Sequence, residues 1–502
     1  MLRSLVKQSI ARRTFVDSKV ASNMALPKPV LFHVQDTARI VTLNRPRKLN
    51  ALNTEMSRAI FDTLKEYAKS ESAQLIVVKS SNQPKSLCAG GDVAAVAEAN
   101  LAGDTDSSLK FFQAEYSLNF QLATYGKPVV AFMDGITMGG GVGISVHNVF
   151  RVATEHTKWA MPEMDIGFFP DVASTFALPR LVTLANGNSQ MALYLVLTGE
   201  VLTGEEAYLL GLASHYVSHA NLDDLQTRLG ELVAPNARFG DKAFYDTVAE
   251  AIEEFAVPLP SGAKLRYSVE QLRVIESCFN AYKLPSIQAL FQNLDRVVSD
   301  QTASEDARQF ASATKQRLLT KSPTSMQVAL RLIQENGRDN LENAVKRDLY
   351  TAANFSLAAL EDSALPVEFS QAVTHKLIKK QKTPYPWKYR LQDLSPSQLT
   401  SLVSPRPSVP LSLLRNTTNI TFKQYPHHHR YQLPSEREVL DYAVGPKGAE
   451  DHPPQTRRHV VEYFTNSHGP SKGKVGTDIL VNLILAKNCK EDQITGNLVR
   501  SH

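Results

Sequence analysis

The chain has 502 residues, of which 43% are apolar and 21% charged, so it has the composition of a globular protein and is too long for one ordinary domain. No uncharged apolar run reaches the roughly 18 residues of a membrane span, and three widely separated cysteines exclude a disulfide framework. The net charge of +5 is unevenly placed: residues 1–29 carry +5, residues 30–404 carry −4 and residues 405–502 carry +4.

The first 20 residues, MLRSLVKQSIARRTFVDSKV, have the composition of a mitochondrial transit peptide. Leu2, Val6 and Ile10 share one helical face, basic residues surround them, and no acid precedes Asp17. A secretory signal is excluded because the apolar core of such signals is missing. A basic tail without function is the alternative. We expect a targeting leader over residues 1–29 and a location in the mitochondrial matrix, a reducing compartment that suits unpaired cysteines.

Residues 30–220 are predicted to form an α/β core. Met56, Ile60 and Leu64 have helical spacing and predict a helix over residues 53–69. Solid apolar runs between helical stretches indicate strands that are buried on both faces, in repeated strand–strand–helix units. The predicted strands cover residues 30–34, 39–43, 75–78 and 128–133.

Strand signals become scarce after residue 220, so residues 221–404 are predicted to be helical, with helices over 304–319 and 325–335. The proline-rich stretch 404–410 predicts a linker to a C-terminal extension, residues 405–502, with helices over 435–443 and 477–487. No metal is expected at His427–His429, because adjacent histidines cannot all face one ion.

Basic residues in the extension alternate with tyrosine and histidine, a pattern typical of surfaces that contact the phosphate backbone of nucleic acids. The alternative is an ordinary solvated extension that packs on the core.

Two glycine-rich segments follow predicted strands. In Cys88-Ala89-Gly90-Gly91-Asp92, paired glycines precede an aspartate expected to cap a helix. Residues 134–143, DGITMGGGVG, run from a buried strand into an apolar helix, where free backbone N–H groups can hold a negative oxygen. The spacing disfavours a dinucleotide or P-loop site. Residues 143–147, GISVH, resemble a serine-hydrolase nucleophile elbow only weakly, because His147 replaces the final glycine.

Carboxylates interrupt the apolar stretch MPEMDIGFFPD at residues 161–171. A buried carboxylate is suited to proton transfer or nucleophilic attack, which makes Glu163 and Asp171 candidates. Asp165 is interpreted as a turn residue. Glu115 lies on a probable helix and, from its local sequence, is expected to be an exposed acid.

Together, CAGGD, GITMGGGVG and WAMPEMDIGFFPDVAS resemble the enoyl-CoA hydratase/isomerase (crotonase) superfamily, and within it the 3-hydroxyisobutyryl-CoA hydrolases. The resemblance covers roughly residues 30–395. It implies an α/β fold: a crotonase-like spiral of ββα units with a helical C-terminal part, to which this chain adds its extension. It also implies an acyl-CoA substrate, hydrolysis of 3-hydroxyisobutyryl-CoA in valine breakdown, and no cofactor, since coenzyme A is part of the substrate.

The resemblance assigns roles to individual residues. The backbone N–H groups of Gly91 and Gly140 would form an oxyanion hole, whose two donors stabilise the negative charge that develops on the thioester oxygen. Glu163 would attack the thioester or activate water, and Asp171 would orient the 3-hydroxyl group or manage protons. Substrate-binding residues would be Glu115, Gly139, Gly141 and Asp92.

One position separates hydrolysis from hydration. Hydratases carry a second catalytic glutamate shortly after the glycine cluster, where this chain has Gly143. Hydration of a double bond would lack half of its acid/base pair, which favours a thioester hydrolase over a hydratase or isomerase. Phe168-Phe169 and Ala173-Ser174-Thr175 depart from the usual family pattern and could reshape the acyl pocket.

The extension suggests a further partner. Long fungal relatives of these hydrolases are components of the mitochondrial small ribosomal subunit, and this chain looks like them. A structural role in that subunit, through rRNA or proteins and either instead of catalysis or in addition to it, is therefore the alternative function.

Overall fold

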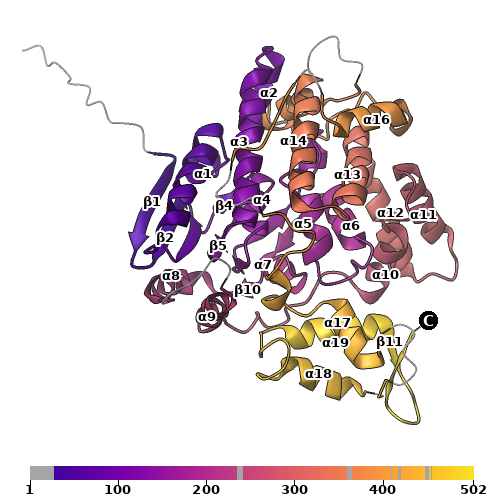
Figure 1. Cartoon of the computed structure of the whole chain (residues 1–502). Helices are drawn as coiled ribbons and strands as arrows, with labels where there is room; N and C mark the ends of the chain where they lie inside the picture. The colour runs from indigo at the N-terminus through magenta and orange to yellow at the C-terminus, as the bar shows by residue number, and fades with distance from the viewer. Residues whose placement is uncertain are drawn as a thin grey trace, which may run out of the picture.

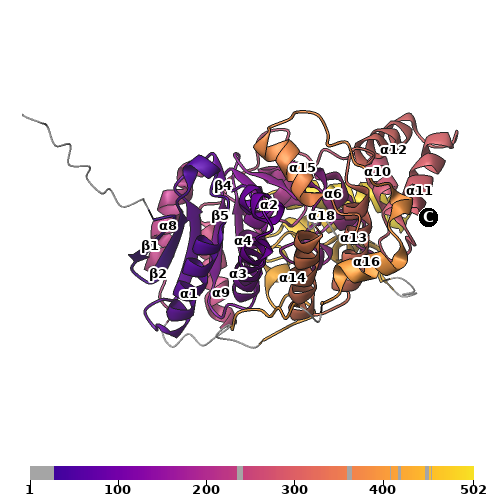
Figure 2. The ribbon, with the colours of Figure 1, turned by 90° about the horizontal axis from the view of Figure 1, so that it is seen from above.

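The computed structural model describes residues 28–234, 241–358, 365–406, 409–415, 420–446, 452–453 and 455–501. The leader predicted over residues 1–29 lies almost wholly outside them. Figures 1 and 2 show the α/β part and the helical part side by side, with the C-terminal extension below both in the view of Figure 1.

The α/β part is built from repeated strand–strand–helix units that contribute to two sheets. The larger sheet has the order β1-β2-β3-β5-β7-β10, and the smaller one has the order β4-β6-β8-β9. Strand β1 is antiparallel to β2, and the rest of the larger sheet is parallel. These strands are β1 (Val30–Gln35), β2 (Ala38–Leu43), β3 (Leu75–Ser80), β4 (Ser86–Cys88), β5 (Val129–Met133), β6 (Ile136–Met138), β7 (Phe150–Ala153), β8 (Lys158–Ala160), β9 (Leu202–Thr203) and β10 (His215–Tyr216).

The smaller sheet brings the three predicted motifs together. Strands β4, β6 and β8 are adjacent and parallel, so their carboxyl ends lie at one edge. The segments after them are residues 89–92, 139–143 and 161–166, which carry the GGD, GGG and PEMD sequences. Motifs that are far apart in the sequence therefore begin at neighbouring points of one sheet edge.

The helices of this part follow the strands they cover. They are α1 (Thr54–Lys69), α2 (Val93–Leu101), α3 (Thr105–Ala123), α4 (Gly140–Val146), the short η2 (Glu163–Ile166), α5 (Ser174–Leu181), α6 (Gln190–Thr198) and α7 (Gly204–Leu209).

Helix α1 confirms the prediction over residues 53–69. The Asn53 side chain accepts a hydrogen bond from the Met56 amide at its start, and Met56, Ile60 and Leu64 are buried. The predicted strands are all present within two residues of their expected ends.

The region after residue 220 is helical, as predicted. Helices α8 and α9 contribute to an apolar cluster that includes residues of β2, β3, β5 and β7, whereas the later helices share the main core with the α/β part. The helices are α8 (Leu222–Glu231), α9 (Lys242–Glu253), α10 (Val269–Cys278), α11 (Ile287–Ser299), α12 (Glu305–Leu318), α13 (Pro323–Asn336), α14 (Leu341–Leu357), α15 (Phe369–Val373) and α16 (Pro396–Val403).

The first part of the C-terminal extension runs along α3 and α14, and its last part, from α17 on, forms a compact unit below α7 and α10 (Figure 1). It contains α17 (Glu436–Val444), α18 (Arg457–Thr465), α19 (Thr477–Asn488) and the antiparallel pair β11 (Cys489–Glu491) and β12 (Leu498–Arg500). The helices predicted over 435–443 and 477–487 are α17 and α19, while α18 and the strand pair were not predicted.

Basic side chains attach the extension to the rest of the molecule. Arg430 pairs with Asp246 of α9, the buried Lys474 pairs with Glu253, and the buried Lys487 contacts Glu276 of α10 as well as Glu436. Arg457 and Arg458 form ion pairs inside the extension. Much of its positive charge is thus neutralised within the protein.

None of the helices in the described ranges combines the length and the apolar character that crossing a bilayer requires.

Candidate active site

The two predicted oxyanion donors lie on loops that touch each other. Gly91 forms a parallel bridge with Leu52, in which the Gly90 carbonyl and the Asp92 amide make the two hydrogen bonds. The N–H group of Gly91 therefore points away from Leu52. Gly140 is the first residue of α4, where N–H groups have no partner one turn earlier. A Cβ atom at Gly140 would lie 3.1 Å from the Gly91 nitrogen, so the two glycines lie against each other.

The glycine run 139–141 is required by close approach of three different groups. A Cβ at Gly139 would lie 3.0 Å from Oε1 of Glu163. At Gly140 it would collide with Oε1 of Glu115, and at Gly141 with the carbonyl of Cys88. Gly139 also has φ +49° and ψ −117°, a conformation that residues with a side chain rarely adopt. The run thus brings two carboxylates and the GGD loop against the start of α4.

Glu115 is buried, with 1% of its surface exposed, and the expectation of an exposed acid is wrong. Helix α3 packs against α1 and α14, and this packing turns Glu115 toward the glycine loops. Its Oε1 atom has no hydrogen-bond partner within the described structure. Burial, together with the charge of Asp171, raises the pKa of Glu115 well above its usual value.

Glu163 and Asp171 are the other two buried carboxyl groups of this cluster. Burial is the main cause that raises the pKa of Glu163, and the charge of Asp171 raises it further. Burial raises the pKa of Asp171 to about 7, although a hydrogen bond from Tyr116 favours its ionised form. Because each of the other two acids faces the charge of Asp171, the three will not all be ionised at neutral pH. A cluster that holds ionised and protonated carboxyl groups at the same time provides both acceptors and donors of protons.

The backbone after Asp171 is held in an unusual conformation. Val172 and Ala173 have φ values of +53° and +54°. The Ala173 amide donates a 2.7 Å hydrogen bond to Oδ2 of Asp348, a buried acid on α14. Residues with side chains adopt this region only where surrounding contacts enforce it, so the direction of Asp171 is imposed by its surroundings.

Gly143 leaves no room for another side chain. A Cβ atom there would lie 2.7 Å from Cβ of Val172 and 2.9 Å from Nδ2 of Asn119. The Val172 side chain therefore lies against the position where hydratases carry their second glutamate.

Two acids next to the motifs form ion pairs. Asp92 precedes α2 as expected, yet its side chain does not cap the helix and instead pairs with Arg45 at 2.8 Å. Asp165 pairs with Lys321 at 2.9 Å, consistent with its interpretation as a structural residue. The residues at 168–169 join an aromatic cluster beside this loop, formed by Phe112, Phe168, Phe169, Phe355 and Phe369.

Basic side chains lie close to the GGD loop. Arg47 and Lys48 are exposed, belong to the short helix η1 (Pro46–Lys48) and form no ion pair within the described structure. The next residue, Leu49, accepts a 3.0 Å hydrogen bond from the Ala89 amide. The backbone next to Arg47 and Lys48 is therefore hydrogen-bonded to the loop that carries Gly91.

Histidines of the run at residues 427–429 contact different parts of the core and do not meet at one point. His427 stacks on Tyr245 with ring centroids 4.8 Å apart, and His428 is buried against the backbone of His147. Within the described ranges, no group of three or more His, Cys, Asp or Glu side chains is arranged to hold a metal ion.

Sequence reasoning missed two residues of the site, Tyr116 and Asp348. Tyr116 directly follows Glu115, so a buried helix face could have pointed to it. Asp348 is far away in the sequence and gave no local signal.

Comparisons with known proteins show to which family the chain is similar. Residues 38–403 match the enoyl-CoA hydratase/isomerase family. The chain is 35% identical to the small ribosomal subunit protein mS47 of Neurospora crassa, over 91% of this chain and 85% of that protein. It is 34% identical to the mitochondrial 3-hydroxyisobutyryl-CoA hydrolase of Danio rerio, over 77% of this chain and 90% of that protein. The crystal structure of a carnitinyl-CoA dehydratase from Mycobacterium thermoresistibile aligns with a TM-score of 0.60 and 26% identity, over 76% of this chain and 98% of that one.

Proposed function

The chain belongs to the enoyl-CoA hydratase/isomerase family, and from this premise we propose that it is a mitochondrial acyl-CoA thioester hydrolase that converts 3-hydroxyisobutyryl-CoA and water to 3-hydroxyisobutyrate and CoA. The mitochondrial location follows from the relatives whose names state it, and the matrix is the compartment we assign within it. The reaction needs no cofactor, because coenzyme A enters and leaves with the substrate.

The packing at Gly143 is the observation that favours hydrolysis over hydration. Because Val172 fills the space beside it, a second glutamate cannot stand there as the partner acid of a hydratase. One carboxylate and two backbone donors are sufficient for acyl transfer to water.

The proposed reaction starts with the thioester oxygen between the N–H groups of Gly91 and Gly140. These fixed donors stabilise the oxyanion of the tetrahedral intermediate, by about 3–4 kcal/mol per donor in comparable sites. Glu163, which lies against Gly139, is positioned to attack the carbonyl carbon or to remove a proton from the attacking water. The C–S bond then breaks, and the leaving thiolate takes a proton from a protonated carboxyl group of the cluster. If Glu163 has acted as the base, the proton it took from water replaces the one used. If Glu163 has attacked, the acyl group is left on it as an anhydride, and water then breaks the bond between the acyl carbon and the Glu163 oxygen, which releases 3-hydroxyisobutyrate, frees Glu163 and returns a proton to the cluster.

Asp171 is assigned to the substrate's 3-hydroxyl group. Tyr116 donates to its Oδ2 atom, so Oδ1 is the oxygen left for a hydroxyl donor. Glu115 carries a raised pKa and is proposed to be protonated, so that it donates a hydrogen bond near the oxyanion site without adding a second negative charge. Arg47 and Lys48 are proposed to contact the phosphates of the coenzyme A part, because they lie beside the Gly91 loop and are not neutralised.

Purified full-length protein tests the proposal. We expect release of free thiol from 3-hydroxyisobutyryl-CoA, detected with a thiol reagent, and no hydration of crotonyl-CoA, detected by loss of enoyl absorbance. Hydration of crotonyl-CoA without thiol release would contradict the proposal and favour a hydratase.

A second function is favoured by one relative. The alignment with mS47 covers 91% of the chain and so must include residues of the extension, which lies outside the matched family region. We propose that the protein also associates with the mitochondrial small ribosomal subunit. Ion pairs with the core hold the extension as a folded part of the protein. We therefore propose that it contacts the subunit with a folded surface and not as a free polycationic tail.

Sedimentation of mitochondrial extract at low salt tests this association. We expect part of the protein in the small-subunit fraction. Its complete absence from that fraction, with a known small-subunit protein present there, would exclude the ribosomal role and leave the hydrolase proposal intact.

A further inference from the structure

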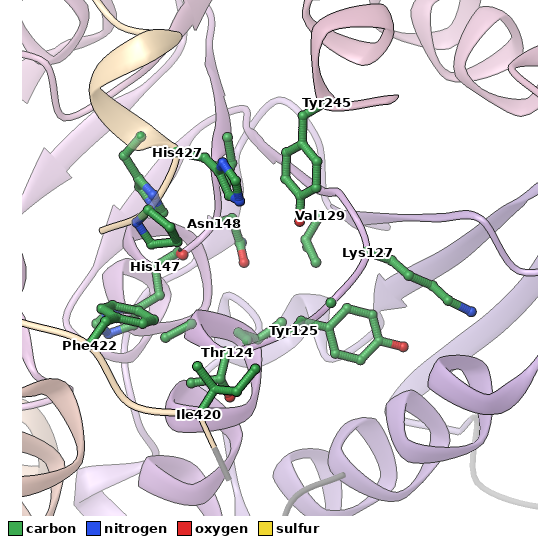
Figure 3. A pocket seen from close by; sticks show the side chains of 16 residues that line it. Thr124, Tyr125, Lys127, Val129, His147, Asn148, Tyr245, Ile420, Phe422 and His427 are labelled. Carbon is green, nitrogen blue, oxygen red and sulfur yellow. Dashed lines mark hydrogen bonds between the residues drawn. The ribbon is translucent and has the colours of Figure 1, made fainter. Parts of the chain in front are cut away.

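The C-terminal extension contacts the part of the core that adjoins the active site. In the segment from Tyr425 to Tyr431, the buried His428 places Nε2 3.1 Å from the carbonyl oxygen of His147. Arg430 donates two hydrogen bonds of 2.8 Å to Asp246. Core and extension together line a cavity of about 80 Å³ at this junction, and Figure 3 shows side chains that line it, among them His147 and Tyr245 from the core and Phe422 and His427 from the extension.

His147 connects the extension to the loop that carries Asp171. Its Nε2 lies 2.7 Å from the Val172 carbonyl oxygen, and its Nδ1 lies 2.7 Å from the Tyr425 hydroxyl. A carbonyl only accepts hydrogen bonds, so Nε2 carries the hydrogen. Burial lowers the pKa of His147 to about 4, so the ring is neutral and Nδ1 accepts the Tyr425 hydrogen. Tyr425 thus selects the tautomer that can hold Val172.

The peptide group between Val172 and Ala173 is bound at both ends. His147 donates to its oxygen, and its N–H group donates to Asp348. Both residues have positive φ values, so the conformation depends on these two bonds. Val172, whose carbonyl belongs to this peptide group, is the residue that directly follows Asp171. The Tyr425 hydroxyl therefore acts on Asp171 through the imidazole ring of His147 and the backbone of Val172.

We propose that Tyr425 and His147 are positioning residues and that the extension completes the active site by holding Asp171 in its working orientation. The inference rests on the proposed hydrolase activity for its kinetic readout. Tyr425 lies beyond the matched family region, residues 38–403, so this contact is a property of the extended chain. The extension is accordingly a part of the enzyme as well as a surface for other partners.

The variant Tyr425→Phe tests the proposal, because it removes one hydroxyl group and keeps the buried ring. We expect kcat for 3-hydroxyisobutyryl-CoA to fall about tenfold while KM changes less than about twofold, the effect of losing one neutral hydrogen bond. The matched control is Tyr431→Phe, which removes the 2.8 Å bond from Tyr431 to Asp246, another contact between the extension and the core. We expect the control to keep kcat within about twofold of the parent protein.

A double-mutant cycle with His147→Leu distinguishes an effect of Tyr425 that passes through His147 to Asp171 from a general loss of stability. If the path is correct, Tyr425→Phe has little further effect on kcat in the His147→Leu protein, because the hydroxyl has lost the ring on which it acts. Additive losses, or equal losses in Tyr425→Phe and Tyr431→Phe, would overturn the inference.

Hydrogen–deuterium exchange gives a readout that does not need activity. We expect Tyr425→Phe to speed exchange in the peptide that spans residues 171–175, where Tyr431→Phe does not. Unchanged exchange there would overturn the inference even in an active enzyme. If the parent protein lacks hydrolase activity but exchange responds as expected, the proposed function fails while the structural link stands.

Discussion

The Tyr116 hydroxyl donates a 2.7 Å hydrogen bond to Oδ2 of Asp171, and both groups are buried. This bond stabilises the ionised form of an acid that burial otherwise disfavours. Residues 115 and 116 are neighbours on α3, so the helix brings to Asp171 one group that favours its ionisation and one acid whose pKa the charge of Asp171 raises.

Replacing Tyr116 by phenylalanine should shift the pH dependence of the enzyme. Loss of the donor raises the pKa of Asp171 above its value of about 7, so a smaller fraction is ionised at neutral pH. We expect the acid limb of the kcat profile to move to higher pH by about 0.5–1 unit, with activity recovering above pH 8. Because Glu115 and Glu163 titrate with Asp171, the measured limb belongs to the cluster. An unshifted limb would show that Asp171 ionisation does not control kcat.

Glu163→Gln should remove most of the hydrolase activity. The amide keeps the size of the side chain but can neither attack the thioester nor accept a proton from water, so we expect kcat to fall by about 10²–10⁴-fold. Glu98→Gln on α2, where the acid is exposed, is the matched control and should retain full activity. Thiol release by the Glu163→Gln protein at the parent rate would refute the proposed role.

Gly140→Ala tests the oxyanion site. The added Cβ would collide with Glu115 and come within 3.1 Å of the Gly91 nitrogen, so both the donor geometry and the acid would move. We expect kcat to fall by about 10²-fold or more, the cost of losing one such donor. Gly187→Ala is the control, since no atom lies within 4 Å of a Cβ at that position. A folded Gly140→Ala protein with parent kcat would exclude this amide as a donor.

The motifs could be predicted from the sequence because each follows a buried strand and contains glycines or carboxylates that a plain loop does not need. Gly91, Gly139, Gly140 and Glu163 do lie together, as the resemblance implied. Their proximity follows from the parallel order of β4, β6 and β8.

The burial of Glu115 could not be predicted. A single acid on a helix has an exposed and a buried interpretation, and only the packing of α3 between α1 and α14 decides between them. The bond between His147 and Tyr425 joins residues 278 positions apart. The sequence left two interpretations of the extension open, a nucleic-acid contact and packing on the core. Lys474 and Lys487 are buried with carboxylate partners, which the pattern of charges and aromatic residues cannot show.

Asp171→Asn should stabilise the folded protein at high pH. The folded-state pKa of about 7 is above the ordinary value of 3.8, so the folded state binds more protons than the unfolded state between these values. Stability of the parent protein is therefore lost as pH rises from about 4 to 7. The asparagine variant avoids this loss, and we expect its free energy of unfolding to exceed that of the parent by about 1–4 kcal/mol at pH 8.

Urea unfolding of both proteins at pH 4 and pH 8 measures this difference. Near pH 4 the parent acid is largely protonated in the folded state, and the two proteins should be similarly stable. A difference of equal size at both pH values would show that packing, not ionisation, causes it.

Charge reversal at Arg47 and Lys48 should weaken substrate binding without affecting the chemistry. Both side chains are exposed, lie next to the Leu49 carbonyl that holds the Ala89 amide, and are proposed to contact the coenzyme A phosphates. Because such contacts are equally strong in the ground and transition states, Arg47→Glu with Lys48→Glu should raise KM by about tenfold or more and leave kcat nearly unchanged. The effect should shrink at high salt, as screening predicts for exposed charges. Lys490→Glu, an exposed site in the extension, should leave KM unchanged. An unaltered KM in the double variant would mean that the phosphates bind elsewhere, and the loop beside Gly91 would then contact only the acyl end of the substrate.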